Sequence, residues 1–184
     1  MKKAFKISMM CLVALMTVGF LTSCDKDESN TNTNTNTNTN VDDANYVDLG
    51  LPSGNKWKTT NETNPESAYN LFTFDEAVEK FGDQLPTSGQ LDELLEKCDW
   101  TWDTIKKGCN VVGPNGNSIF LPAAGSINHS GNFGGVGQYG SYWSSSTSPD
   151  NVYGKNIYFG YDVDPDLNGV YRDCCNSVRL VKTK

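Results

Sequence analysis

The chain has 184 residues, with 15 lysines and arginines against 22 aspartates and glutamates, and its formal net charge is −7. A nucleic-acid-binding surface needs clustered Lys and Arg to neutralise phosphates. Because the chain has no basic patch and only two arginines, Arg172 and Arg179, this class of function is excluded.

The N-terminus has the pattern of an export signal. Lys2, Lys3 and Lys6 precede an apolar run over residues 7–21, which is too short for a comfortable membrane span. The following box, Leu-Thr-Ser-Cys, resembles the signature of a bacterial lipoprotein signal. That resemblance implies cleavage before Cys24 and diacylglycerol on its thiol, so that lipid chains hold the protein on a membrane. The alternative is plain secretion with an incidental cysteine.

Residues 24–44 are expected to form the lipidated cysteine and a disordered tether. Acidic residues within 25–28 are followed by Asn-Thr repeats over 30–40, a tract without apolar residues that cannot offset its ordering entropy. An acidic stretch after the lipidated cysteine resembles the surface-export signal of some Gram-negative lipoproteins. We therefore expect an outer-membrane lipoprotein displayed on the cell surface, with a solvated periplasmic linker as the alternative. Removal of residues 1–23 takes away three lysines and no acids, which leaves 12 basic and 22 acidic residues and a net charge of −10.

Residues 45–184 have the usual size of one domain, and their pattern predicts an α+β fold. A first strand is expected over 46–51 and a short second strand around Trp57. Two helix starts are expected at capping boxes, in which a threonine and a Glu or Gln three residues later satisfy each other's backbone N–H groups. The two boxes are Thr73 with Glu76, before a helix through about Phe81, and Thr87 with Gln90.

Short strands are expected in the second half of the domain. Residues 110–112 and 118–121 flank Pro114-Asn115-Gly116, which is a strong hairpin turn signal. Three later strands are expected over 141–145, 156–159 and 177–181.

Several of these stretches resemble, in the same order, segments of the Fibrobacter succinogenes major paralogous domain family. They are YVDLGLPSGNKW, LPTSGQLDELLEKCDWTW, GPNGNSIFLPAAG, GSYWSSS, NIYF and NSVRLV, and they span residues 46–182. The resemblance implies a C-type-lectin-like domain, in which the first and last strands pair and loops project from one end. It also implies part of a surface lipoprotein or adhesin, and the family supplies no activity to carry over. Where the family usually has a glycine before the final strand, this chain has Arg172-Asp-Cys-Cys-Asn176.

Four cysteines remain after the signal and the lipidated residue, an even number that suits an oxidising compartment. Cys98, Cys109, Cys174 and Cys175 are therefore disulfide candidates, and the sequence does not choose among their three possible connectivities.

The sequence also contains a candidate calcium site. Asp162, Asp164 and Asp166 alternate in an expected loop, and alternating carboxylates can direct several oxygens at calcium. Leu167 stands where a calcium loop of the EF-hand kind needs glycine, and Pro165 stiffens the segment. The alternative is an acidic turn between strands. No other cofactor is indicated.

The C-terminal region contains tyrosines interspersed with small polar residues. This composition is typical of adaptable recognition surfaces. Alternation in strand 156–159 predicts that Ile157 and Phe159 face inward and that their neighbours face outward, whereas the four tryptophans are expected in the core. The candidate ligand-binding residues are Tyr153, Lys155, Asn156, Tyr158, Tyr171, Asp173, Cys174 and Cys175.

These observations predict a lipid-anchored, surface-displayed binding module, adhesin-like and not an enzyme, that recognises a glycan or a protein through its C-terminal loop face. The alternatives are an enzyme on the same fold, acting on glycans or as a cysteine oxidase, and a structural fimbrial component. The only histidine, His129, lies in a polar loop and argues against an enzyme. A further hypothesis is that the C-terminal region is diversified at adenine-containing codons, with the exposed candidate residues forming one face.

Overall fold

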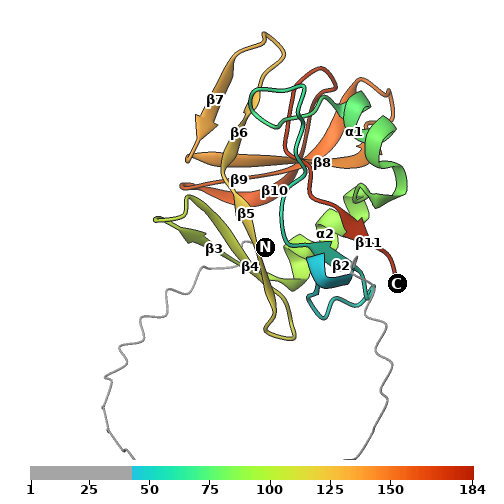
Figure 1. Ribbon diagram of the computed structural model, residues 1–184, viewed down its shortest axis with the longest axis vertical. Helices are drawn as coiled ribbons and strands as arrows, with labels where there is room; N and C mark the ends of the chain where they lie inside the picture. Colours follow the sequence, from blue (N-terminus) through green and yellow to red (C-terminus); the bar gives the residue numbers. More distant parts are fainter. Residues whose placement is uncertain (1–42) are drawn as a thin grey trace, which may run out of the picture. The chain divides into compact units, whose positions relative to one another are not determined.

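The computed structural model describes residues 43–184, and they lie within one compact unit (Figure 1). The predicted signal, Cys24 and most of the predicted tether lie outside the described residues. The described part contains two α-helices and many short strands, so the predicted α+β class is confirmed.

The elements follow one another in the order η1 (Asp43–Asn45), β1 (Tyr46–Asp48), β2 (Lys56–Lys58), α1 (Phe74–Phe81), η2 (Gly82–Gln84), α2 (Ser88–Lys97), β3 (Asp99–Asp103), β4 (Gly108–Val112), β5 (Ser118–Pro122), β6 (Ala124–Ile127), β7 (Phe133–Val136), β8 (Tyr139–Thr147), β9 (Tyr153–Gly160), β10 (Val163–Tyr171) and β11 (Val181–Lys182).

Both helices begin at the predicted capping boxes. The side chain of Thr73 accepts a hydrogen bond from the backbone of Glu76, whose carboxylate accepts one in return from the backbone of Thr73. Thr87 and Gln90 make the same reciprocal pair at the start of α2. These two predictions are confirmed. The sequence could make them because a capping box involves residues only three positions apart.

The strands form three sheets, with the orders β1-β2-β11, β10-β9-β8-β6-β7 and β3-β4-β5. The last strand pairs with β2 and so shares a small sheet with the first strand (Figure 1). The predicted hairpin around Pro114 is present as β4 and β5, in antiparallel register from Val112↔Ser118 to Gly108↔Pro122.

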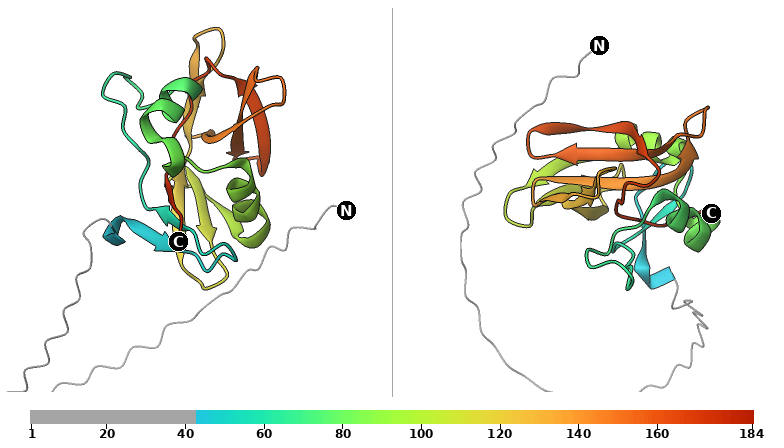
Figure 2. Two further views of the ribbon diagram at one scale, coloured as in Figure 1. Left: turned by 90° about the vertical axis from the view of Figure 1, so that its right-hand side faces the viewer. Right: turned by 90° about the horizontal axis from the view of Figure 1, so that it is seen from above.

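The five-stranded sheet has a hydrophobic core on each face. Ile157 and Phe159 of β9 pack with Leu91 and Leu94 of α2 in one cluster. Trp143 of β8 packs with α1 in the other cluster, and the helices lie on different sides of the strands (Figure 2). Alternation along each strand explains this, since successive side chains enter opposite faces.

The C-terminal segment covers the face of the sheet that carries the core around Trp143. This segment is not the continuous strand that the sequence predicts. Asn176 forms an isolated bridge with Phe72, and Ser177 forms one with Tyr142. The prediction of a strand over 177–181 is therefore wrong. Residues 176–180 contact several different segments, and only β11 pairs with another strand in a sheet.

The buried Arg179 fastens this segment to the rest of the domain, with a side chain that is 2 % exposed. Its guanidinium donates to Asn61 Oδ1, to the carbonyl of Lys58 at 2.9 Å and to that of Phe120 at 3.0 Å. The hydroxyl of Tyr142 lies in the same network, and burial raises the pKa of this tyrosine to about 12. The donors of Arg179 thus satisfy carbonyls that the closing segment would otherwise bury unpaired.

Most of the predicted acidic loop is a strand. Asp162 ends the turn after β9, whereas Asp164 and Asp166 lie in β10, which pairs with β9 through a bulge between Val163 and Asp166. An edge strand accepts Pro165 because one row of its N–H groups needs no ladder partner, and charged side chains there discourage pairing with another chain. The prediction of a loop is wrong for Asp164 and Asp166, whereas Asp162 does lie in a turn.

Candidate functional site

The predicted ligand-binding residues lie at two ends of one strand pair. Tyr153 is opposite Tyr171 in the β9–β10 register, whereas Tyr158 is opposite Asp166, five residues further along β9. Lys155 shares a face of β9 with Tyr153, and Tyr158 is on the opposite face by alternation. The hypothesis that the candidates form a single exposed face is therefore wrong.

Two of the candidates are buried. Asn156 was predicted to face outward, but it is 1 % exposed and donates to Ser141 Oγ at 2.8 Å. Alternation correctly places Asn156 and Ile157 on opposite faces of the sheet. The face that carries Asn156 is nevertheless covered too, by the core around Trp143. Cys174 is also buried and packs in this second core. Neither side chain is available to a ligand.

A cleft lies where the β9–β10 turn meets the β7–β8 turn and the tip of the β3–β4 hairpin. Its volume is about 450 Å³. We call it the aromatic cleft and define it by the rings of Trp102, Tyr139, Tyr158 and Tyr161 and the polar side chains of Lys107, Gln138 and Asp162. Tyr158 and Asp162 were predicted site residues, and the structure places them together in this cleft.

The four rings of the aromatic cleft form two contacting pairs. Trp102 meets Tyr161 edge-on, with ring centroids 6.0 Å apart, and Tyr139 lies 5.2 Å from Tyr158. Burial raises the pKa of Tyr158, with a further contribution from Tyr139, so its phenol stays neutral at ordinary pH. Tyr161 is 62 % exposed, which leaves part of its ring open to solvent.

Backbone contacts between the turns fix the walls of the aromatic cleft. The N–H of Tyr161 donates to the carbonyl of Gln138 at 3.0 Å and so joins the β9–β10 turn to the β7–β8 turn. Gly135 has φ +82°, and a Cβ there would lie 1.9 Å from the ring of Tyr139. Only glycine lets this ring lie against the turn in that conformation.

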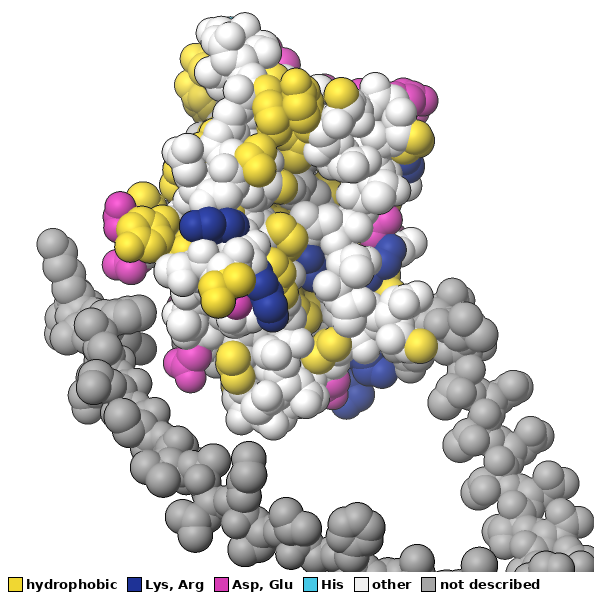
Figure 3. Space-filling view, turned by 60° about the vertical axis from the view of Figure 1, so that its left-hand side comes forward, with side chains coloured by type: hydrophobic (Ala, Val, Ile, Leu, Met, Phe, Trp, Pro, Cys, Tyr) yellow, Lys and Arg dark blue, Asp and Glu magenta, His cyan; other side chains and the backbone are white. Residues whose placement is uncertain are grey.

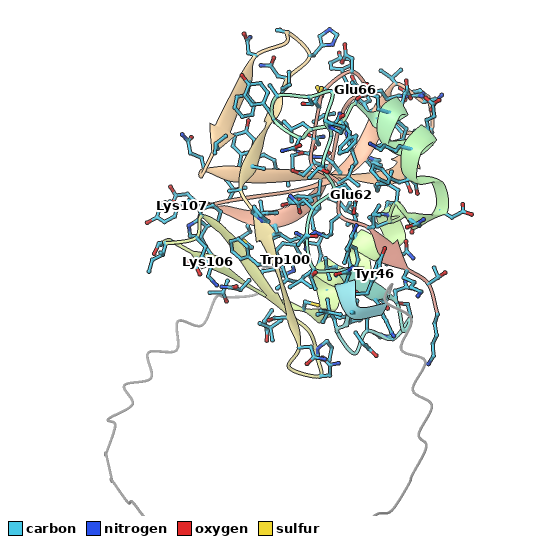
Figure 4. The ribbon with its side chains drawn as sticks, in the orientation of Figure 1. Tyr46, Glu62, Glu66, Trp100, Lys106 and Lys107 are labelled. Carbon is cyan, nitrogen blue, oxygen red and sulfur yellow. The ribbon has the colours of Figure 1, made fainter. Side chains whose placement is uncertain are left out.

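Lys107 enters the cleft from the β3–β4 turn. Its φ is +57°, and its carbonyl accepts from the N–H of Ala123 at 2.9 Å. Figure 4 shows Lys106 and Lys107 at the tip of this hairpin, beside the ends of β9 and β10. Figure 3 shows the same side of the molecule, where exposed hydrophobic side chains form separate patches with basic side chains beside some of them.

A second group lies at the other end of β10, and we call it the His129 cluster: His129, Tyr153, Tyr171 and Asp173. His129 Nδ1 is 2.6 Å from a carboxylate oxygen of Asp173, and the ring of Tyr171 lies 4.6 Å from His129 and 4.9 Å from Tyr153. Hydrogen bonding with Tyr171 raises the pKa of Tyr153. His129 lies in an exposed loop and is paired with Asp173.

Arg172 sits beside the His129 cluster and pairs with Asp75 at the start of α1. The cavity there, about 440 Å³, is lined by Asp75, Tyr171, Arg172 and Asp173 among others. Its charges are mostly neutralised by one another, since Arg172 pairs with Asp75 and Asp173 pairs with His129. This leaves fewer free polar groups for a ligand than the aromatic cleft has.

The four cysteines within residues 43–184 are free thiols in the structure, so none of the three predicted connectivities is formed there. Burial raises the pKa of Cys98 to about 11 and that of Cys109 to about 12, and it also raises the pKa of Cys174 and Cys175. Within residues 43–184, no group of three or more His, Cys, Asp or Glu side chains could hold a metal ion.

Sequence reasoning missed the part of the cleft that lies outside the C-terminal region. Trp102 was expected in the core, and it is only half-buried. A usable signal was the alternation Trp100-Thr-Trp102, which places both indoles on one face of β3. In the structure these indoles meet Phe159 and Tyr161, which are also two residues apart.

Comparison of the chain with models of protein families, with curated proteins and with solved structures found no match. In the part of the chain that the structure describes, no helix is long and apolar enough to cross a membrane.

Proposed function

We propose that this chain is a lipid-anchored binding module, displayed on the surface of a Gram-negative cell, that recognises a glycan or a protein. The observation that carries the proposal is the aromatic cleft, where four rings and three polar side chains line one cavity. Ligand sites typically combine aromatic lining with a few polar groups that fix orientation.

The arrangement of the aromatic cleft favours binding. Its rings come from β3, β8, β9 and the β9–β10 turn, so strand pairing holds most of them. Tyrosine and tryptophan offer large contact areas with only two side-chain torsions, so a ligand orders them at small entropic cost. Neighbouring glycines, such as Gly137 and Gly160, leave room for close approach to the backbone.

The same proposal gives the domain a C-type-lectin-like fold. Its support is the shared sheet of β1, β2 and β11, which brings the two ends of the domain together, and the turns of the second half that gather at one side. The predicted lipoprotein signal supports the anchor, and the acidic residues that follow Cys24 support surface display.

A direct test is to probe a glycan and host-protein array with the full-length chain, with and without calcium. We expect specific binding that Tyr161→Ala weakens, because this ring is the most exposed in the aromatic cleft. Tyr171→Ala is the matched control, since it removes a 43 % exposed tyrosine from the other end of β10. Failure of the folded chain to bind any glycan or protein would contradict the proposal.

A further inference from the structure

We infer that the aromatic cleft binds an uncharged sugar ring, a proposal that rests on the binding function above. The choice of ligand follows from the charges in the cleft, from its rings and from its size.

The opposite charges of Lys107 and Asp162 give the aromatic cleft no net preference for a charged ligand of either sign. Lys107 and Asp162 both line the cavity, and no ion pair joins either of them to another described residue. A cationic ligand, such as a quaternary ammonium group in an aromatic cage, would be attracted by the rings and by Asp162 but repelled by Lys107. An anionic ligand would be attracted by Lys107 but repelled by the carboxylate of Asp162. A neutral ligand avoids both penalties.

The rings of the aromatic cleft suit a ligand with one apolar face. Aromatic rings have a negative face and a positive edge, so they attract weakly positive C–H groups to the face. A pyranose ring presents such C–H groups on one side and hydroxyl groups around its edge. Exposed Tyr161 and half-buried Trp102 and Tyr158 can supply the apolar contact.

The polar groups around these rings can both donate and accept hydrogen bonds. Lys107 only donates, Asp162 only accepts, and the amide of Gln138 does both. Sugar hydroxyls also do both, so they can satisfy all three side chains, whereas a purely apolar ligand would leave them without partners. The cavity of about 450 Å³ lies within the usual range of ligand sites.

The test uses the full-length chain in a detergent without a sugar headgroup. The probes are the methyl glycosides of glucose, galactose and mannose, methyl N-acetylglucosaminide, and the disaccharides cellobiose and lactose. Choline and glucuronate are the charged comparisons. Saturation-transfer NMR reports which sugar protons contact the protein, and tryptophan fluorescence gives the dissociation constant.

We expect at least one neutral sugar to bind with saturation, and choline and glucuronate to bind more weakly. Tyr161→Ala should weaken sugar binding about tenfold, because it removes one stacking surface. Tyr171→Ala should leave binding unchanged, and EDTA should leave it unchanged because the cleft groups bind the sugar directly. Circular dichroism of both variants checks that they are folded.

Three results would overturn the inference: no neutral sugar binds, choline or glucuronate binds more tightly than every neutral sugar, or Tyr171→Ala weakens binding as much as Tyr161→Ala does. The array separates this failure from failure of the binding function. If the chain binds a protein or a charged glycan there, the binding function stands and only the sugar inference fails. If it binds nothing on the array, both fail.

Discussion

Trp143 joins three segments of the domain through one side chain. It is fully buried, its indole N–H donates to the carbonyl of Phe72 at 2.8 Å, and its ring meets Phe74 edge-on. Its own N–H donates to the carbonyl of Ser177, so backbone and side chain both hold the closing segment.

Trp143→Ala is therefore expected to lower the free energy of unfolding by about 3–5 kcal/mol, the usual cost of truncating a buried tryptophan. Urea denaturation followed by circular dichroism measures it. Ile105→Ala is the control, because Ile105 is 90 % exposed and its loss should change stability by less than about 0.5 kcal/mol. Equal effects of the two substitutions would show that Trp143 is not a core residue.

The pKa of each buried thiol depends on the surroundings of that residue. Burial raises the pKa of Cys98 and Cys109 above the ordinary value of 9.0. Their neutral forms therefore stabilise the native state fully below pH 9, and this contribution is lost as the pH rises from 9 toward 12. Since the thiolate is the reactive form, both side chains should be poor nucleophiles near neutral pH.

Alkylation by iodoacetamide at pH 8 tests this. A pKa of about 12 makes the native Cys109 thiolate about a thousandfold rarer than at the ordinary value of 9.0. Half-buried Cys175 should react first, and the four cysteines of residues 43–184 should all react in urea without reductant. Peptide mass spectrometry identifies the modified sites. If the cysteines resist alkylation in urea until a reductant is added, they form disulfides. That result would contradict the free thiols of the structure.

At the scale of elements, close contacts between sheets depend on small residues. The β4–β5 turn rests against β1, where the side-chain amides of Asn115 and Asn117 donate to the carbonyl of Asp48 at 2.9 and 2.8 Å. Gly113 lies at the start of this turn, and a Cβ there would be 2.1 Å from the carbonyl oxygen of Leu49.

Gly113→Ala should consequently destabilise the domain by about 1–3 kcal/mol, since backbone must move to relieve the clash. Thermal unfolding monitored by circular dichroism reports the loss. Gly134→Ala is the matched control, because a Cβ at that position meets nothing within 4 Å. A Gly113→Ala variant that melts with the wild type would mean that the turn does not pack on β1 as described.

The elements also show which features sequence reasoning can reach. The capping boxes and the hairpin around Pro114 depend on residues close in the chain, and both were predicted correctly. β10 was missed because its Asp-Pro-Asp segment has little strand propensity and is extended only through pairing with β9. The aromatic cleft was missed in part because Trp102 and Lys107 come from a hairpin far from β9 in the sequence. Their proximity is a property of sheet packing.

At the scale of the whole domain, the chain enters away from the aromatic cleft. Figure 4 shows Lys107 at the left edge of the domain and Tyr46, the first residue of β1, in the lower right part. β11 lies in the same sheet as β1, so the C-terminal end is on the entry side too. An anchor that precedes residue 43 would thus attach to the domain at a distance from the proposed ligand.

The anchor itself is predicted from Leu21-Thr-Ser-Cys24, and it can be tested in cells. In wild-type cells, labelled fatty acid should enter the protein, and the protein should fractionate with the outer membrane. Cys24→Ala removes the thiol that would carry the lipid, so the variant should take up no label and should leave the membrane fraction or stay unprocessed. Cys175→Ala is the control for loss of a thiol as such. Incorporation of label into Cys24→Ala would contradict the lipoprotein signal.

Surface display is a separate prediction, because a lipoprotein can face either compartment. Protease added to intact cells should remove the domain if it is displayed, since the predicted tether contains an Asn-Thr tract without apolar residues and is expected to be a cleavage site. A periplasmic protein should survive until the outer membrane is broken, and one is included as the control. Resistance in intact cells with cleavage after lysis would place the domain in the periplasm, where the aromatic cleft could meet only periplasmic ligands.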